Sequence, residues 1–288
     1  MNTPRTPDAC GKSPAAAVPT AVRTWLYVPA TRPDLLAKAM SGDADAVVLD
    51  LEDAVPEARK GEARAQAAEA VRARWPKPLW IRVNDVRHPH GTADLEALAG
   101  APVDGLRLPK CESRQQIAIA LSHVDAPLHL LFETALGVER AYELAADARR
   151  VTLLSLGEAD LRADLRIRAD AALDWARARI VNAARAAGLA GPVQSVYTDV
   201  ADLDGLATST EHGRDHGFFG RSVVHPRQIA PVNSLFTPTP LEIAGARSLI
   251  DSLNTAADAG SAAWLDERGR LIDPAVVAQA RWILERTG

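Results

Sequence analysis

Short apolar runs alternate with longer helix-like stretches along the chain from residue 23 onward, and this alternation restricts the fold more than any other feature. Repeated strand–helix units of this kind predict a parallel sheet covered by helices. The runs that read as strands cover residues 24–29, 45–51, 79–83, 105–109, 127–133, 151–157, 192–198 and 220–225. Eight strands with helices between them favour an α/β fold of the closed (β/α)8 TIM-barrel type over an open doubly wound sheet. The sequence also lacks the glycine-rich phosphate-binding motifs that would argue for an open sheet.

The two ends of the chain lie outside this alternation. Residues 1–21 are rich in Pro, Ala and Thr and lack the apolar segment of a signal peptide, so we expect a flexible N-terminal tail. Residues 22–237 would form the barrel, and residues 238–288 would form a C-terminal helical extension of the same domain. The last helix of this extension carries apolar residues that must be buried somewhere: Val276, Val277, Ala280, Ile283 and Leu284. We expect them to pack on a neighbouring subunit, with the chain's own barrel as the alternative.

Composition favours a protein that acts on small molecules. The formal net charge of −4 and the absence of basic clusters with interleaved aromatics give no reason to expect binding to nucleic acid. No apolar run approaches the length of a membrane span, so we expect no membrane association. Two cysteines, Cys10 and Cys111, form neither a disulfide framework nor a zinc motif, which favours a reducing cytoplasm.

Ionisable side chains stand at the carboxyl ends of most of the predicted strands. In a barrel of this type the active site is built at those ends, because the loops that follow the strands converge there. A single charge after a strand usually faces solvent or caps the next helix, but this does not explain why most of the strands end in a charged residue. The ionisable residues are Asp50, Glu52, Asp53, Arg82, Asp85, Lys110, Glu133, Glu158, Asp160, Asp199 and His225, and the polar Asn84 lies among them.

Glu133 and Asp160 are the candidates for a metal site. They end two consecutive predicted strands, and adjacent strands in a sheet lie only about 5 Å apart. Two carboxylates at that spacing repel unless a proton or a cation lies between them. Because no histidine or cysteine cluster is near them in the sequence, hard oxygen ligands favour Mg²⁺ in an open site that leaves positions for substrate oxygens.

Two arginines are candidates for binding an acidic substrate. Arg82 ends a strand beside the predicted metal, and its planar guanidinium matches a carboxylate with two parallel hydrogen bonds. A metal ion and an arginine together suit an oxo-acid. Arg23 precedes the first strand, where a salt bridge at the base of the barrel is an alternative to substrate binding.

Other polar residues have ordinary structural explanations. His225 precedes Pro226 and reads as the start of a helix, although it would also suit a base. Lys110 would suit a Schiff base, but pairing with Glu52 or Glu112 explains it equally well. The remaining histidines, which include His129, His212 and His216, show no ligand-like spacing.

A series of motifs in this order resembles the citrate lyase β-subunit-like branch of the HpcH/HpaI aldolase superfamily. They are "RTWLYVPATRPDLLAKAM", "DAVVLDLEDAV", "RVN", "LPKCES", "FETALGV", "SLGEADLRADL", "VYTD", "GFFGRSVVHPRQI" and "RLIDPAVVAQA". Several are weak individually, but nine in the right order are specific, and they span the chain from Arg23 to its end. The resemblance implies a (β/α)8 barrel, a homotrimer or hexamer, and Mg²⁺-dependent chemistry on the carbon–carbon bond of a 3-hydroxyacyl thioester.

The same resemblance implies roles for individual residues. Glu133 and Asp160 match the metal ligands, and Arg82 matches the arginine that binds the substrate carboxylate and takes part in catalysis. The substrate-binding set is Arg23, Arg82 and Glu133, and the residues that support the metal site are Glu52, Asp53 and Lys110. Asp273 matches an aspartate that reaches a neighbouring subunit's site as an acid or base. That role would explain the C-terminal extension.

The sequence departs from the family pattern in three places. The first strand ends in "VPA" where "VPG" is common, "GEAD" permutes "GAED", and Arg166 stands where a glycine is frequent. These changes keep the predicted ligands but adjoin the mouth of the pocket, so they bear on the choice of substrate.

We therefore predict a Mg²⁺-dependent carbon–carbon lyase that acts on a malyl-, citramalyl- or citryl-CoA type of thioester and releases an oxo-acid and an acyl-CoA. One alternative is a thioesterase or malate-synthase-like activity on the same thioesters. Another is a citrate lyase β subunit that needs a partner acyl-carrier protein. A third is a barrel that binds a metabolite without turnover.

Overall fold

A curled parallel sheet forms the centre of the protein. The computed structural model describes residues 22–147, 149–258, 263–266 and 269–286, and the predicted tail 1–21 lies outside this part. The sheet has the order β6-β5-β4-β3-β2-β1-β7, with every pair parallel. The strands are β1 (Thr24–Pro29), β2 (Ala46–Asp50), β3 (Leu79–Arg82), β4 (Gly105–Leu108), β5 (Leu128–Phe132), β6 (Val151–Leu156) and β7 (Arg221–Val223).

The seventh predicted strand, 192–198, is reduced to two bridges between the sheet edges. The Val193 amide donates to the Leu154 carbonyl of β6 (2.8 Å), and the Gln194 amide donates to the Gly220 carbonyl beside β7 (2.9 Å). The chain leaves the ladder after this point, and the carbonyl of Tyr197 accepts instead from the side-chain amide of Gln228 (2.8 Å). The (β/α)8 TIM-type barrel is therefore confirmed, with a short irregular segment in place of one full strand.

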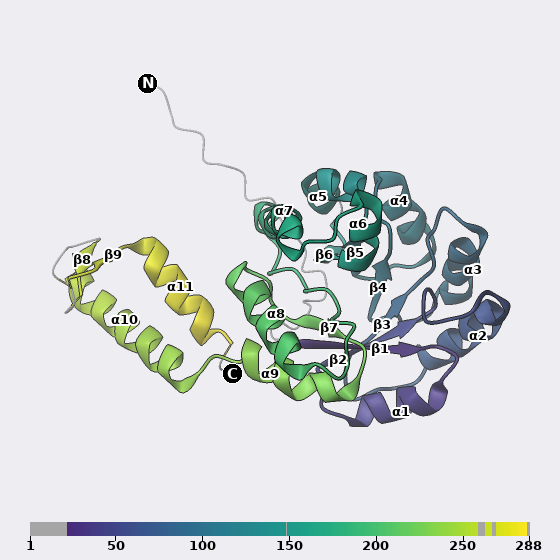
Figure 1. Cartoon of the computed structure of the whole chain (residues 1–288), viewed down its shortest axis with the longest axis horizontal. Helices are drawn as coiled ribbons and strands as arrows, with labels where there is room; N and C mark the ends of the chain where they lie inside the picture. The colour runs from purple at the N-terminus through teal and green to yellow at the C-terminus, as the bar shows by residue number, and fades with distance from the viewer. Residues whose placement is uncertain (1–21, 148, 259–262, 267–268, 287–288) are drawn as a thin grey trace, which may run out of the picture.

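Helices cover the outside of the barrel (Figure 1), as alternating strand–helix units require. They are α1 (Pro33–Ser41), α2 (Lys60–Ala70), α3 (Pro89–Leu98), α4 (Arg114–His123), α5 (Ala135–Asp147), α6 (Glu158–Leu165), α7 (Asp174–Ala186), α8 (Leu203–Asp215) and α9 (Ile229–Phe236), with short 3-10 turns η1 (Glu57–Arg59), η2 (Asp170–Leu173) and η3 (Pro226–Gln228). The sequence sets several of their starts: proline occupies the first turn of α1 and α3, and the Asp202 carboxylate accepts from the Gly205 amide (2.8 Å) at the start of α8.

Strand side chains alternate between two layers, as the period of a β-strand dictates. Leu106 and Leu108 of β4 belong to the main core with the surrounding helices. The side chains that alternate with these point into the barrel. At the base of the barrel, the rings of Trp25, Trp80 and His129 meet edge to face at centroid separations of 5.4–6.1 Å. A side chain at Gly105 would overlap the Trp80 ring, since its Cβ would lie 2.4 Å away, so glycine makes room for this base.

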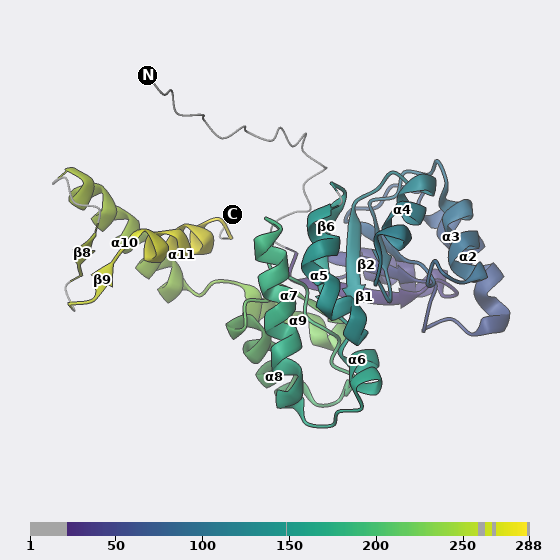
Figure 2. The ribbon, with the colours of Figure 1, turned by 90° about the horizontal axis from the view of Figure 1, so that it is seen from above.

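The C-terminal extension projects from the barrel as a separate arm (Figures 1 and 2). It consists of α10 (Pro240–Asp258), a two-stranded antiparallel ribbon of β8 (Trp264–Leu265) and β9 (Leu271–Ile272), and α11 (Pro274–Leu284), which packs on α10. Near its end α11 returns to the barrel, where Trp282 meets Phe219 edge to face. Packing on the chain's own barrel thus accounts for this end of α11.

Several apolar side chains of the arm lie in solvent. Leu241, Leu265 and Leu271 are 82%, 65% and 61% exposed. Packing of the arm on a neighbouring subunit, which would cover such residues, stays a prediction. Within the described ranges, no helix combines the length and apolar composition needed to cross a bilayer.

Candidate active site

A pocket of about 340 Å³ opens at the carboxyl ends of the barrel strands. Its walls come from residues that are far apart in the sequence, including Tyr27, Asp50, Asp53, Arg82, Arg107, Glu133, Ser155, Glu158, Asp160, Ser195 and Ser222. The structure therefore brings Glu133, Asp160 and Arg82 into one cavity. This convergence is the reason that parallel barrels place their sites at this end.

Arg82 is held by three carboxylates, one at the end of β2 and two in the loop that follows it. Its Nε and Nη2 donate to Asp50 at 2.6 and 2.7 Å, and Nη1 lies 3.0 Å from Asp53 and 3.1 Å from Glu52. Asp50 also accepts from the amides of Glu52 and Ala54 at 3.0 Å each. Burial alone would raise the pKa of Asp50, but the charge and hydrogen bonds of Arg82 outweigh it and hold that pKa below its ordinary value.

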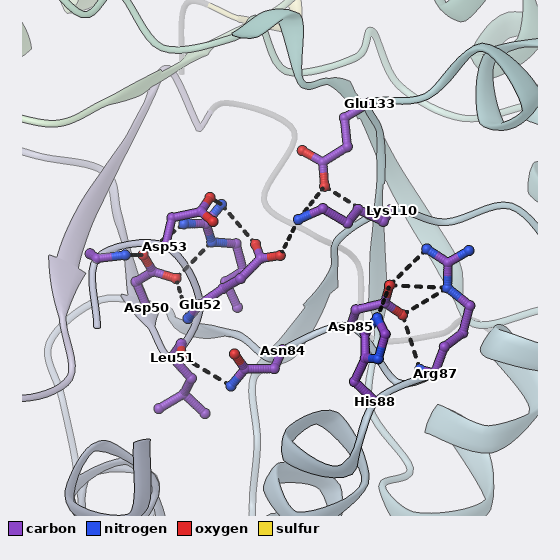
Figure 3. A network of polar contacts seen from close by, with 12 residues as sticks. Asp50, Leu51, Glu52, Asp53, Asn84, Asp85, Arg87, His88, Lys110 and Glu133 are labelled. Atoms are coloured by element: carbon purple, nitrogen blue, oxygen red, sulfur yellow. Dashed lines mark hydrogen bonds and ion pairs between the residues drawn. The ribbon is translucent and has the colours of Figure 1, made fainter. Parts of the chain in front are cut away.

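Lys110 connects this cluster to Glu133 (Figure 3). Its Nζ donates to Glu52 at 2.7 Å and lies 4.0 Å from Glu133 Oε1, while its backbone amide donates to the same oxygen at 2.8 Å. The backbone of Lys110 has a φ of +49°, a conformation that non-glycine residues adopt rarely and that often occurs at functional sites. The pairing with Glu52 confirms the structural explanation of Lys110.

Glu133 is a buried carboxylate among other negative charges. Burial raises its pKa to about 8, and the charges of Glu52 and Asp160 add to the rise, whereas Lys110 opposes it. Gly157 packs directly against this side chain, because a Cβ at that position would lie 2.5 Å from Glu133 Oε2. A residue with a side chain at position 157, directly after β6, would therefore collide with Glu133.

The donor set around Glu133 fits a hard cation. Glu133 and Asp160 present carboxylate oxygens to the pocket, and Asp160 is exposed in the first turn of α6, where the helix dipole favours a negative charge. Carboxylate oxygens with room for water and substrate are the surroundings that Mg²⁺ prefers. A cation between these groups would offset the burial and the neighbouring negative charges that together raise the pKa of Glu133.

The inverted "GEAD" motif gives Glu158 a different task from Asp160. The Glu158 carboxylate accepts two hydrogen bonds, at 2.8 and 2.9 Å, from the buried Arg177 of α7. Arg177 also pairs with Asp170 (2.7 Å) and Asp174 (2.9 Å). Asp160 keeps its predicted place at the pocket, while Glu158 is tied to the helix layer.

A second group that could hold a metal ion lies in that layer, at α7 and α8. Ligand atoms of Asp174, His212 and His216 all lie within 4.8 Å of one another. His212 Nε2 is 2.9 Å from the Asp174 carboxylate, and His216 Nδ1 is bonded to the His212 carbonyl at 2.8 Å. Imidazole ligands suit transition metals better than Mg²⁺. His212 and His216 are four residues apart at the end of α8, a spacing that puts both on one helix face and that the sequence analysis overlooked. Asp174 comes from a different helix, so the sequence did not show that it joins them.

Arg23 lies at the opposite end of the barrel from the pocket. It precedes β1, and its guanidinium donates to Asp45 at 2.9 Å and to Thr237 at 2.8 Å. Arg23 is not among the residues that line the pocket, so this position does not support the expectation, taken from the resemblance, that Arg23 binds substrate. The alternative of a salt bridge at the base is the one the structure shows, because a residue before a parallel strand belongs to the amino end of the sheet.

Asp273 begins α11, in the part of the arm that lies away from the barrel (Figures 1 and 2). Its carboxylate caps that helix by accepting from the amides of Ala275 and Val276, at 3.0 Å each. It is not among the residues that line the pocket of its own chain. His225 likewise caps a turn, since its ring accepts from the Arg227 amide (3.1 Å), which confirms the structural explanation.

Arg107 is a charged pocket residue that the sequence analysis missed. It lies inside β4, between Leu106 and Leu108, and lines the pocket although it is only 1% exposed. The search covered residues at the ends of strands, whereas Arg107 stands within one. A charge in the middle of a predicted buried strand was the signal that could have found it.

A parallel barrel with an acid-rich pocket at the carboxyl ends of its strands defines a class, that of α/β-barrel enzymes with a metal-compatible site. Comparison with known proteins narrows the class. Residues 23–226 match the family described as HpcH/HpaI aldolase/citrate lyase. The chain belongs to this family, and it is an enzyme of that family.

Relatives match nearly the whole chain. The citrate lyase subunit beta of Leuconostoc mesenteroides subsp. cremoris is 32% identical over 91% of this chain and 92% of its own length. A (3S)-malyl-CoA thioesterase of Cereibacter sphaeroides is 35% identical over 92% of this chain and 94% of its own. The crystal structure of CitE from Mycobacterium tuberculosis, in complex with magnesium, acetoacetate and coenzyme A, superimposes with a TM-score of 0.81 at 32% identity. It covers 94% of this chain and 100% of that one.

Proposed function

We propose that this protein is a Mg²⁺-dependent lyase that cleaves the carbon–carbon bond of a 3-hydroxyacyl-CoA and releases an oxo-acid and an acyl-CoA. One observation carries the proposal: the buried Glu133 and the exposed Asp160 line the same pocket as Arg82. The names of the relatives support the thioester class, since they include citrate lyase, a malyl-CoA thioesterase, and a structure with magnesium and coenzyme A.

Glu133 and Asp160 would hold the metal ion, with Lys110 and Glu52 fixing the orientation of Glu133. When bound, Mg²⁺ would act as a Lewis acid that stabilises negative charge on the substrate's oxygens. Arg82 adds positive charge at the pocket wall, although its donors already face three acids. We therefore expect Arg82 to attract the substrate partly through its charge, because its guanidinium N–H groups are already engaged by these acids.

Cleavage requires that the hydroxyl proton leaves and that the acyl fragment gains a proton at its α-carbon. We assign the second transfer to Asp273 of a neighbouring subunit, because the arm carries Asp273 away from its own barrel and leaves its apolar residues exposed. D273N tests this role, since asparagine caps a helix as well as aspartate does. We expect unchanged stability and loss of turnover. Mixing inactive D273N with inactive D160N should restore part of the activity only if Asp273 acts across subunits.

The reaction is tested by incubating the protein and Mg²⁺ with malyl-CoA, citramalyl-CoA and citryl-CoA. Formation of an oxo-acid and an acyl-CoA supports a lyase, and release of free CoA indicates a thioesterase. Turnover that begins only when an acyl-carrier protein is added indicates a subunit of a larger lyase. D160N should lose Mg²⁺-dependent turnover by a factor of about 100 or more, because the metal would lose a charged ligand.

A matched control for D160N is D34N, which removes an exposed aspartate in α1 that pairs with Arg32. We expect D34N to behave like the unmodified protein. Activity of D160N equal to that of D34N would remove Asp160 from the metal site. Tight binding of an oxo-acid with no turnover of any thioester would instead indicate that the protein binds a metabolite without catalysing a reaction.

A further inference from the structure

One residue that lines the pocket is a buried arginine, Arg107, which has no acidic partner in the described part of the chain. Arg107 Nη1 donates to the Tyr27 hydroxyl (2.7 Å) and to Ser222 Oγ (3.0 Å), while its Nε and Nη2 are buried and have no partner among the described residues. Leaving a buried charge uncompensated is among the most costly arrangements in a protein interior. Arg107 is one of the residues that line the cavity, so an anion bound there would lie beside its guanidinium group.

The neighbours of Arg107 do not supply the missing negative charge. Its register partners are Arg82 on β3 and His129 on β5. Burial lowers the pKa of His129 far below its ordinary value, with a further contribution from the charge of Arg107, so this ring stays neutral. On the β1 side the guanidinium lies over the rings of Trp25 and Tyr27, at 5.7 and 5.1 Å from their centroids.

A second unpaired group belongs to Ser155 of β6, which lines the same cavity. Ser155 is 2% exposed and lines the pocket, and its hydroxyl has no hydrogen-bond partner among the described residues. Ser222 of β7 accepts from Arg107 and retains a proton to donate. Buried polar groups without partners are rare, and two that border one cavity indicate that a ligand completes them.

We propose that Arg107, together with the hydroxyl groups of Ser155 and Ser222, forms an anion-binding subsite that takes a second carboxylate of the substrate's oxo-acid portion. This inference rests on the proposed function, because it concerns the same pocket. The planar guanidinium matches a carboxylate, and each serine can donate one more hydrogen bond. The subsite selects dicarboxylic oxo-acids, and hence citryl-type thioesters over malyl- or citramalyl-type ones.

The test compares 2-oxo acids of equal chain length that differ at the far end. Oxaloacetate is paired with 2-oxobutyrate, and 2-oxoglutarate with 2-oxovalerate, and each dissociation constant is measured by calorimetry in the presence of Mg²⁺. The unmodified protein should bind at least one dicarboxylic acid about tenfold or more tightly than its methyl-ended partner. R107M should reduce this ratio to about 1–2 and leave binding of the methyl-ended acid within about twofold.

Two further variants keep the test independent of folding defects. R107K retains the positive charge but not the planar guanidinium group, so it should keep part of the preference for dicarboxylic acids. S155A removes one hydroxyl and should lower the ratio by a smaller factor of about 2–3. A ratio below about 2 in the unmodified protein, or an unchanged ratio in R107M, would overturn the proposal.

Failure of the proposed function would look different. Binding of the oxo-acids requires no turnover, so the ratio can be measured whether or not any thioester is cleaved. An intact preference without cleavage would leave the subsite standing and remove the lyase reaction. Cleavage of malyl-CoA and citramalyl-CoA with no preference for a second carboxylate would do the opposite.

Discussion

Two neighbouring arginines of one pocket, Arg82 on β3 and Arg107 on β4, have opposite surroundings. They are partners in the strand register, and both guanidinium groups lie over the ring of Tyr27. Arg82 is enclosed by Asp50, Glu52 and Asp53, whereas Arg107 contacts hydroxyl groups and rings and keeps two nitrogens unpaired.

The difference separates a structural charge from a charge that awaits a ligand. A buried cation that is paired with acids has its charge compensated, and removing it leaves those acids to repel one another. A buried cation without an acid costs stability in the free protein and gains it back when an anion binds. The resemblance to the family implies that Arg82 binds the substrate carboxylate. In the structure, however, Arg107 is the arginine with unpaired N–H groups among the described residues.

The largest expected effect comes from replacing each arginine by methionine and comparing stabilities. R82M leaves three acids without their shared cation and should lower the free energy of unfolding by about 3–5 kcal/mol. R107M loses two hydrogen bonds but removes an unpaired charge, so it should stay within about 1 kcal/mol of the unmodified protein. Urea denaturation at pH 7, without Mg²⁺ and at one protein concentration, measures both.

Arg32 provides the matched control for these two substitutions. It is exposed in the loop before α1 and pairs only with Asp34 among the described residues, so R32M should change stability by less than about 1 kcal/mol. Equal losses for R82M and R107M would break the comparison, because they would mean that both arginines are structural.

A smaller, pH-dependent effect is expected from Asp50. Arg82 holds the pKa of Asp50 below its ordinary value of 3.8, so the folded state binds the proton less readily than the unfolded state does. The stabilisation is fully present above pH 3.8 and is lost as the pH falls through the lowered pKa. D50N should therefore cost about 2 kcal/mol at pH 7, and its deficit against the unmodified protein should shrink below pH 4.

The control for D50N is D53N, which removes another partner of the same arginine. Asp53 is 59% exposed, so its loss should cost less than that of Asp50. Urea midpoints at several pH values between 7 and 3 measure both variants. A deficit of D50N that stays constant down to pH 3 would show that the Asp50–Arg82 pair does not contribute through its charge.

The sequence was sufficient to find the acid-rich half of the pocket. Parallel strands of a barrel bring their carboxyl ends to one rim, so residues after successive strands must meet there wherever the exact strand boundaries fall. Glu133 and Asp160 were found in this way. The same rule explains why Arg23 lies away from the pocket, since a residue that precedes a parallel strand lies at the other rim.

Three features depended on contacts that the sequence does not contain. The segment 192–198 has strand-like composition, yet only Val193 and Gln194 bridge the sheet edges. The group of Asp174, His212 and His216 arises from the packing of α7 beside α8. Whether a carboxylate faces Arg107 depends on which strands flank β4, and no local pattern records that.

The sequence by itself determined the alternation of strands and helices, the barrel class, and the end of the barrel at which the chemistry lies. Those properties follow from periodicity and chain direction, which are local. The tertiary structure decided which charges are paired and which are free, because pairing depends on side chains brought together from distant strands. Arg82 and Arg107 are both arginines within or at the end of an apolar run, and only their neighbours in space distinguish them.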